Sequence, residues 1–141
     1  MDVEGIIESL EYAKKFAGKK VVIKLGGELL EKSIAEGIAK DLTLLRSLNI
    51  DVVVVHGGGK ELSELMQKMG KQPVFVDGKR FTDEETLKLA EMVFLGSSKS
   101  GLLQALIAAG ERPVGLSGRD AGFIRAQKTG DLGLVGIVEK I

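Results

Sequence analysis

Two clusters of glycines follow largely apolar segments of the chain and are the residues best suited to bind an anion. Gly26 and Gly27 follow residues 21–25, and three glycines at 57–59 follow residues 52–56. Each segment has the composition of a buried parallel strand, and ligands of open α/β sheets bind at the carboxyl ends of such strands. Glycines let backbone N–H groups approach an anion, and a following helix adds its amino terminus. The clusters therefore predict a phosphate or carboxylate site.

Three side chains could supply chemistry around such a site. Lys24 lies in the first strand, where its ammonium could reach over the glycines, although a lysine at a strand edge could also extend into solvent. His56 is the only histidine and invites a general-base interpretation, but a hydrogen-bonded structural role is favoured. Arg80 has the planar fork that binds carboxylates, with a solvated surface position as the alternative. One histidine without clustered carboxylates predicts no metal site.

The composition excludes several classes of function. Twenty basic and twenty acidic residues leave no net charge to attract nucleic acid or an anionic membrane surface. No apolar run approaches the length of a membrane span. The absence of cysteine excludes disulfides and thiolate metal sites and fits a cytoplasmic protein. Neither glycine cluster has the spacing of a P-loop or of a dinucleotide-binding fingerprint.

The spacing of apolar residues predicts alternating helices and strands in one domain, residues 1–141. An N-terminal helix is expected within residues 1–17, further helices at 33–48, 62–69 and 102–107, and core strands at 21–25, 52–55 and 113–116. Hairpins are expected around Asp77 and Gly78 and between residues 123–127 and 134–138. This order predicts an α/β fold, a three-layer αβα sandwich with a mainly parallel central sheet and peripheral β-hairpins.

Two local signals concern the segment after the first hairpin. Thr82 and Glu85 have the spacing of a capping box, which predicts that a helix opens at Thr82. Gly96 is expected to interrupt that helix before the next one begins.

Six segments, taken in order, carry a resemblance to a known family. They are residues 24–27 (KLGG), 56–59 (HGGG), 77–82 (DGKRFT), 91–96 (EMVFLG), 114–120 (VGLSGRD) and 131–136 (DLGLVG). In these segments the chain resembles the amino acid kinase family, and within it the acetylglutamate kinases of arginine biosynthesis. The likeness covers nearly the whole chain. The leading helix resembles the helix that links dimers into hexamers in ring-forming members, which implies a homo-oligomer.

The resemblance implies ATP-dependent transfer of a phosphoryl group to the side-chain carboxylate of N-acetylglutamate, with Mg²⁺ carried by ATP and no dedicated metal site. Because a carboxylate is already ionised at neutral pH, this reaction needs no general base at His56. By resemblance the site residues are Lys24 at the transferring phosphoryl group, Gly26 and Gly27 for phosphate, Gly57 and Gly58 for the acceptor, and Arg80 for the α-carboxylate of the acceptor.

Two departures from the family pattern shape the expectation. Family members carry a second half with most of the ATP site, and this chain lacks it. Relatives also have an asparagine–lysine pair after the glycine that matches Gly96, whereas this chain reads Ser-Ser-Lys-Ser-Gly at 97–101. We therefore expect an N-terminal, acceptor-binding half that is inactive alone and for which a C-terminal half would be a partner. The alternatives are a non-catalytic scaffold or oligomerisation module, and a related kinase for aminoadipate, glutamate or aspartate derivatives.

Overall fold

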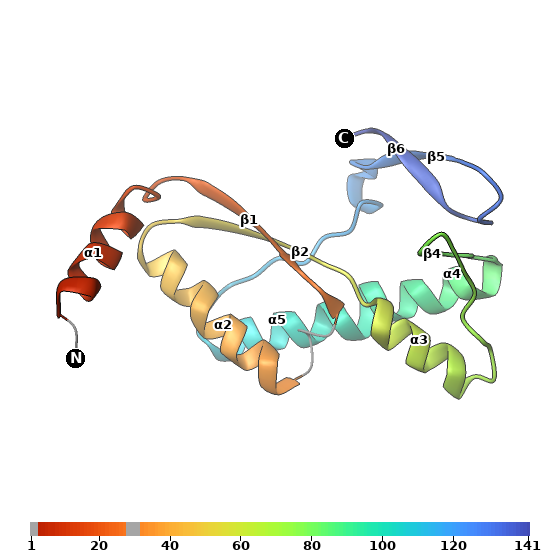
Figure 1. The fold of residues 1–141 in the computed structure, drawn as a ribbon, viewed down its shortest axis with the longest axis horizontal. Helices are drawn as coiled ribbons and strands as arrows, with labels where there is room; N and C mark the ends of the chain where they lie inside the picture. The colour runs from red at the N-terminus through yellow and green to blue at the C-terminus, as the bar shows by residue number, and fades with distance from the viewer. Residues whose placement is uncertain (1–2, 28–31) are drawn as a thin grey trace.

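The computed structural model describes residues 3–27 and 32–141 and has a mixed α/β fold (Figure 1). The elements in chain order are α1 (Val3–Lys14), β1 (Lys20–Leu25), α2 (Lys32–Ser47), β2 (Asp51–His56), α3 (Gly59–Lys68), β3 (Phe75–Val76), β4 (Lys79–Arg80), α4 (Glu84–Glu91), the π-helical segment η2 (Met92–Ser98), α5 (Lys99–Ala108), the short turn η3 (Asp120–Gly122), β5 (Arg125–Lys128) and β6 (Gly136–Lys140). No helix within these two ranges is long and apolar enough to cross a membrane.

The strands that precede the two glycine clusters lie side by side. β1 and β2 pair in parallel, from Lys20 opposite Asp51 to Leu25 opposite His56. Because side chains alternate across a strand, Leu25 and its neighbours on the same face pack onto α2 and α5. On the opposite face, Val22 is 67% exposed and Val53 is 50% exposed. The predicted α/β class and the parallel pairing are confirmed, and the layers agree broadly with the predicted sandwich.

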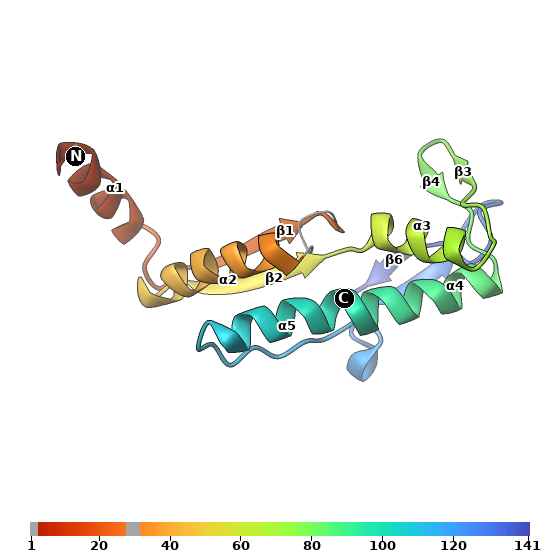
Figure 2. The same cartoon turned by 90° about the horizontal axis from the view of Figure 1, so that it is seen from below.

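A long helix supports two apolar cores. α4, η2 and α5 follow one another without a break over residues 84–108, and Figure 2 shows them running along one side of the molecule. At one end α5 packs on α2 and on the sheet, while at the other end Leu62 and Met66 of α3 pack against Leu89 and Val93. The predicted interruption at Gly96 is therefore wrong. A helical glycine costs only about 1 kcal/mol relative to alanine, and packing at both ends outweighs that.

The predicted strand at residues 113–116 is also wrong. Among the described residues this segment belongs to no β-ladder, although it runs beside β2. A cavity of about 180 Å³ separates the two, lined on one side by Val54 and on the other by Pro113 and Val114. Pro113 has no N–H to donate to a ladder, and Val114 is 82% exposed. The apolar composition of a strand is present here, but the pairing is not.

Both predicted hairpins form. β3 and β4 pair across Asp77 and Gly78, whose φ angles of 49° and 74° are those that a tight type I′ turn requires. β5 and β6 pair in antiparallel fashion near the end of the chain. The connection between β5 and β6 returns to the first hairpin, because the N–H of Leu134 donates to the carbonyl of Thr82 over 2.6 Å. Gly133 is needed at this contact, since a Cβ there would overlap that carbonyl oxygen.

The capping box predicted at Thr82 is wrong by one residue. Asp83 is the N-cap of α4, and its Oδ1 accepts the N–H of Thr86 over 2.8 Å. Lys71 donates to both oxygens of Asp83, at 2.9 and 2.6 Å, and to Glu85 at 2.7 Å. The bond from the Lys71 side chain, followed by those from Thr86, holds the pKa of Asp83 well below its usual range. Asp83 thus serves as both the cap and the ion-pair partner, whereas the backbone of Thr82 is hydrogen-bonded to Leu132 and Leu134.

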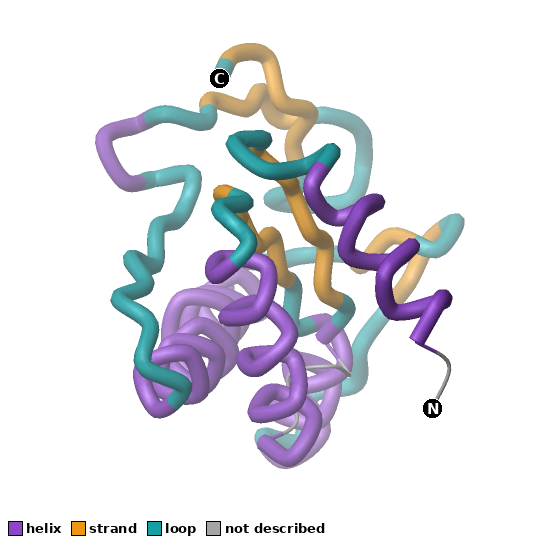
Figure 3. The backbone as a smooth tube through the Cα atoms, turned by 90° about the vertical axis from the view of Figure 1, so that its left-hand side faces the viewer, coloured by secondary structure: helices purple, strands orange, loops and turns teal. Residues whose placement is uncertain are grey.

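Helix α1 stands apart from the rest of the molecule at one end (Figure 2), and Figure 3 looks onto that end. None of its residues is buried, and its apolar residues Val3, Ile6, Ile7 and Leu10 are each 46% exposed or more. Tyr12 and Phe16 stack edge to face, with ring centroids 5.3 Å apart. The predicted N-terminal helix is present, but within this chain it buries no core residue.

The contribution of the Lys71–Asp83 ion pair to stability should appear as a pH-dependent difference in Tm between D83N and the wild type. Asparagine keeps an N-cap acceptor but removes the charge, so D83N should have a lower Tm than the wild type at pH 7. Because the folded-state pKa of Asp83 is depressed, its contribution is present above the unfolded-state value of about 3.9 and is lost as the pH falls below it. The difference in Tm should therefore shrink below about pH 4. A pH-independent difference in thermal melts would contradict this account.

Candidate functional site

The two glycine clusters meet at the carboxyl ends of β1 and β2. We call Gly26 and Gly27 the first glycine loop and residues 57–59 the second glycine loop. A Cβ built at Gly27 would lie 3.0 Å from the Cα of Gly58 and 3.2 Å from the backbone nitrogen of Gly59. The two backbones are therefore in contact at a distance that no side chain fits, as the sequence predicts for neighbouring parallel strands. Residues 28–31, which follow the first loop, lie outside the described residues.

The second glycine loop is pressed against the long helix. Gly58 is buried, and a Cβ there would lie 2.6 Å from Ser98 Oγ and 2.9 Å from both Phe94 and Val93. All three neighbours belong to η2. Gly58 is also the N-cap of α3, so this contact fixes where the amino terminus of α3 begins. The loop amides and the helix amino terminus together form a concentration of N–H dipoles suited to an anion.

Arg80 reaches the same loop from the first hairpin. Its Nη2 donates to the carbonyl of Gly59 over 3.0 Å and to Ser63 Oγ over 2.7 Å. Its guanidinium carbon lies 4.7 Å from the ring centroid of Phe75, the residue opposite it across the hairpin. Partial burial lowers the pKa of Arg80, but a guanidinium remains charged at neutral pH. Arg80 is therefore a fixed cation at the second glycine loop, and the solvated surface position is wrong.

Lys24 and His56 lie on opposite faces of the sheet. Lys24 pairs with Val55 in the register of the ladder and is exposed on the face that α2 and α5 leave open. His56 alternates to the covered face, where it borders the 180 Å³ cavity beside α5, and its Nδ1 lies 3.2 Å from the carbonyl of Gly57. The arrangement fits a structural role for His56. Lys24 is on the open face of the sheet, close to the first glycine loop in the sequence.

Sequence reasoning missed a carboxylate at the start of α3. Glu61 lies in the first turn, and its Oε2 accepts Ser98 Oγ over 2.6 Å while its other oxygen accepts Ser97 Oγ. Ser98 is 3% exposed, so its hydroxyl lies away from bulk water, whereas Ser97 is exposed. Two signals pointed to these residues: Glu61 lies two positions after Gly59 in the sequence, and Ser97 and Ser98 lie where the family pattern differs.

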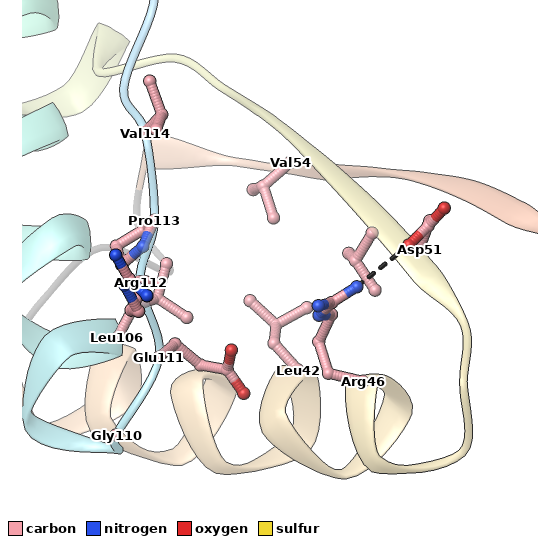
Figure 4. A pocket seen from close by; sticks show the side chains of 11 residues that line it. Leu42, Arg46, Asp51, Val54, Leu106, Gly110, Glu111, Arg112, Pro113 and Val114 are labelled. Carbon is pink, nitrogen blue, oxygen red and sulfur yellow. Dashed lines mark hydrogen bonds and ion pairs between the residues drawn. The ribbon is translucent and has the colours of Figure 1, made fainter.

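A larger cavity, of about 520 Å³, lies away from the glycine loops, between α2, the beginning of β2 and the segment after α5 (Figure 4). Its floor is apolar, with Leu42, Val54 and Leu106, and an ion pair of 2.9 Å between Arg46 and Asp51 borders it. Asp51 begins β2, whereas the glycine loop follows its end, so this cavity is at the opposite end of the sheet. Within residues 3–27 and 32–141 no group of three or more histidines and carboxylates is placed to hold a metal ion.

The comparisons with known proteins agree with this architecture. Residues 19–141 match the amino acid kinase family. An acetylglutamate kinase of Methanoculleus marisnigri is 42% identical over 150 residues, which cover 96% of this chain and 52% of that protein. An acetylglutamate kinase of Desulfitobacterium hafniense is 43% identical and is covered over 50% of its length.

Solved structures give the same fold. The N-acetylglutamate synthase of Neisseria gonorrhoeae, crystallised with coenzyme A and N-acetyl-glutamate, superposes with a TM-score of 0.82 at 29% identity. The match covers 99% of this chain and 33% of that one. The same enzyme in complex with coenzyme A and L-arginine gives a TM-score of 0.80. The chain thus spans about half the length of the curated relatives and a third of the solved structures.

A methyl group at Gly58 should destabilise the protein, whereas one at Gly59 should not. The Cβ of G58A would overlap Ser98 and Phe94, and such overpacking costs about 1–3 kcal/mol. A Cβ at Gly59 meets nothing within 4 Å, so G59A is the matched control. Urea denaturation followed by circular dichroism would measure both. Equal midpoints for G58A and G59A would show that the loop is not held against η2.

Proposed function

Because the chain belongs to the amino acid kinase family, we propose that it binds N-acetylglutamate as the acceptor in an acetylglutamate kinase reaction. In that reaction the γ-phosphoryl group of ATP passes to the side-chain carboxylate. The observation that carries the proposal is the contact between the two glycine loops, with Arg80 anchored beside them. Backbone amides from two strands and one fixed cation suit a small ligand with two carboxylates.

The named relatives support the acceptor as the ligand. The kinases take their name from acetylglutamate, and the synthase was crystallised with N-acetyl-glutamate. The kinases and the synthase thus share acetylglutamate in their names, and this chain matches part of each of them. Acetylglutamate is therefore the acceptor to test first.

Each candidate residue has a role in the proposal. Gly57 and Gly58 hold the acceptor, and Arg80 binds its α-carboxylate through guanidinium donors not used for Gly59 and Ser63. Lys24 approaches the transferring phosphoryl group from the open face of the sheet, and Gly26 and Gly27 donate N–H groups to phosphate. The missing Cβ at Gly27 makes room for the backbone of the second glycine loop, which brings the amides of the two loops close together. ATP would bring Mg²⁺, which neutralises charge on the phosphoryl group.

The second candidate is an acceptor-binding unit that does not transfer phosphate. The chain covers about half of each kinase relative, and complete catalysis would need a C-terminal half as partner. A kinase acting on aminoadipate, glutamate or aspartate derivatives is a third candidate. Arg80 would recognise only the carboxylate that these acceptors share, so comparison of their affinities separates them.

A titration with N-acetylglutamate followed by nitrogen–proton correlation spectra tests the proposal. We expect shifts at Gly57, Gly58 and Arg80, and at least tenfold weaker binding for R80K, because lysine lacks the bidentate fork. The exposed Arg125 provides the control variant R125K, which should bind like the wild type.

The α-amide of N-acetylglutamate sharpens this test. If Arg80 binds the α-carboxylate, the amide should bind weakly to the wild type, and R80K should weaken it no further. A dispersed spectrum that does not change with N-acetylglutamate would refute the proposal. Tighter binding of N-acetyl-aminoadipate would identify that compound, and not N-acetylglutamate, as the acceptor.

We also propose that α1 mediates self-association. Its unburied apolar stripe, which includes Ile6 and Leu10, supports this role. The double variant I6E/L10E should sediment as a smaller species than the wild type, because charges on the stripe oppose burial. The variant E8Q on the same helix is the control. Equal sedimentation coefficients for I6E/L10E and wild type would exclude α1 as the contact.

A further inference from the structure

Glu61 stands in an unusual place for an anion-binding loop. The N-cap of α3 is Gly58, so Glu61 is the third helical residue and carries a carboxylate within one turn of the loop amides. At this position a glutamate commonly turns back and accepts the N–H of the N-cap residue. An incoming carboxylate would need the same group of amides. Left unrestrained, the Glu61 side chain would be a tethered competitor of the ligand.

In the structure Glu61 does not turn back. Its carboxylate points to η2, where Ser98 Oγ donates over 2.6 Å and Ser97 Oγ donates to the other oxygen. Ser98 is 3% exposed and lies directly over Gly58, so its hydroxyl is fixed by packing. Both oxygens of the carboxylate are thereby engaged on the side of α3 that faces the long helix.

We propose that Ser97 and Ser98 are positioning residues that hold the Glu61 carboxylate away from the second glycine loop and so keep its amides available to an anionic acceptor. This inference rests on the proposed function, since it assigns a purpose to hydroxyl groups that do not touch the acceptor. A hydrogen bond to a charged group is stronger than one between neutral groups, which makes two hydroxyls sufficient to hold one carboxylate. Removing them lets Glu61 compete for the loop by hydrogen bonding and by charge repulsion.

Affinity for N-acetylglutamate, measured by isothermal titration calorimetry, separates this role from simple packing. S97A/S98A should bind about tenfold more weakly than the wild type, which corresponds to about 1.4 kcal/mol. Adding E61A should restore the affinity, because the competitor is gone. Packing defects would not be rescued by a further deletion. The control S100A removes a hydroxyl of α5 that contacts Gln104 and should bind like the wild type.

The outcomes distinguish the inference from the proposed function. If the wild type does not bind N-acetylglutamate, the proposed function fails and the inference falls with it. If the wild type binds and S97A/S98A binds equally well, or if E61A/S97A/S98A stays as weak as S97A/S98A, only the inference is overturned.

A second pair of variants keeps the test valid if S97A/S98A does not fold. Ser97 is exposed, so S97A leaves the packing around Gly58 intact. S97A should bind two- to threefold more weakly, and E61A/S97A should recover the affinity. Unchanged affinity in a folded S97A protein would contradict the proposal.

Discussion

The absence of a side chain at Gly58 is the constraint on which the rest of the site depends. The backbone of this residue touches Ser98, Phe94 and Val93 of η2 at distances that exclude even a methyl group. This contact sets the start of α3 and therefore the direction in which its first N–H groups point. Gly27 also packs against the backbone of Gly58. The contacts of Gly58 therefore position both glycine loops relative to the long helix.

The long helix explains why the site is placed where it is. α5 anchors the sheet and α2 through one core, and α4 anchors α3 through the other. η2 lies between these cores and carries the residues that contact the second glycine loop. π-helical turns occur often at functional sites, where the wider turn changes the direction of side chains. Here the π-helical segment presents Ser97 and Ser98 toward the beginning of α3.

Some of this architecture could be predicted from the sequence, because it depends on short-range patterns. Apolar runs ending in glycines predicted β1, β2 and the loops after them, and parallel neighbours must end on the same side. The Asp77–Gly78 turn predicted the first hairpin for the same local reason. The strand expected at 113–116 failed because composition does not show whether a partner edge comes close enough to pair.

The parts of the site that the sequence did not predict are contacts between distant segments. Glu61 and Ser98 are 37 residues apart, and Arg80 and Gly59 are 21 apart. No periodicity relates such positions, and a serine that binds a carboxylate resembles any other serine in the sequence. The capping position at Asp83 also involves distant contacts, since Thr82 is hydrogen-bonded to Leu132 and Leu134 and Asp83 is paired with Lys71. The chemistry-bearing residue types were visible, but the partners that orient them were not.

The sequence separation between Glu61 and Ser98 also affects how the molecule opens locally. Contacts that close a long stretch of chain form only after nearby helices have already been built, because their loop entropy is high. We therefore expect the second glycine loop and the first turn of α3 to open together rather than to fray separately, with their amides exchanging with solvent as one unit.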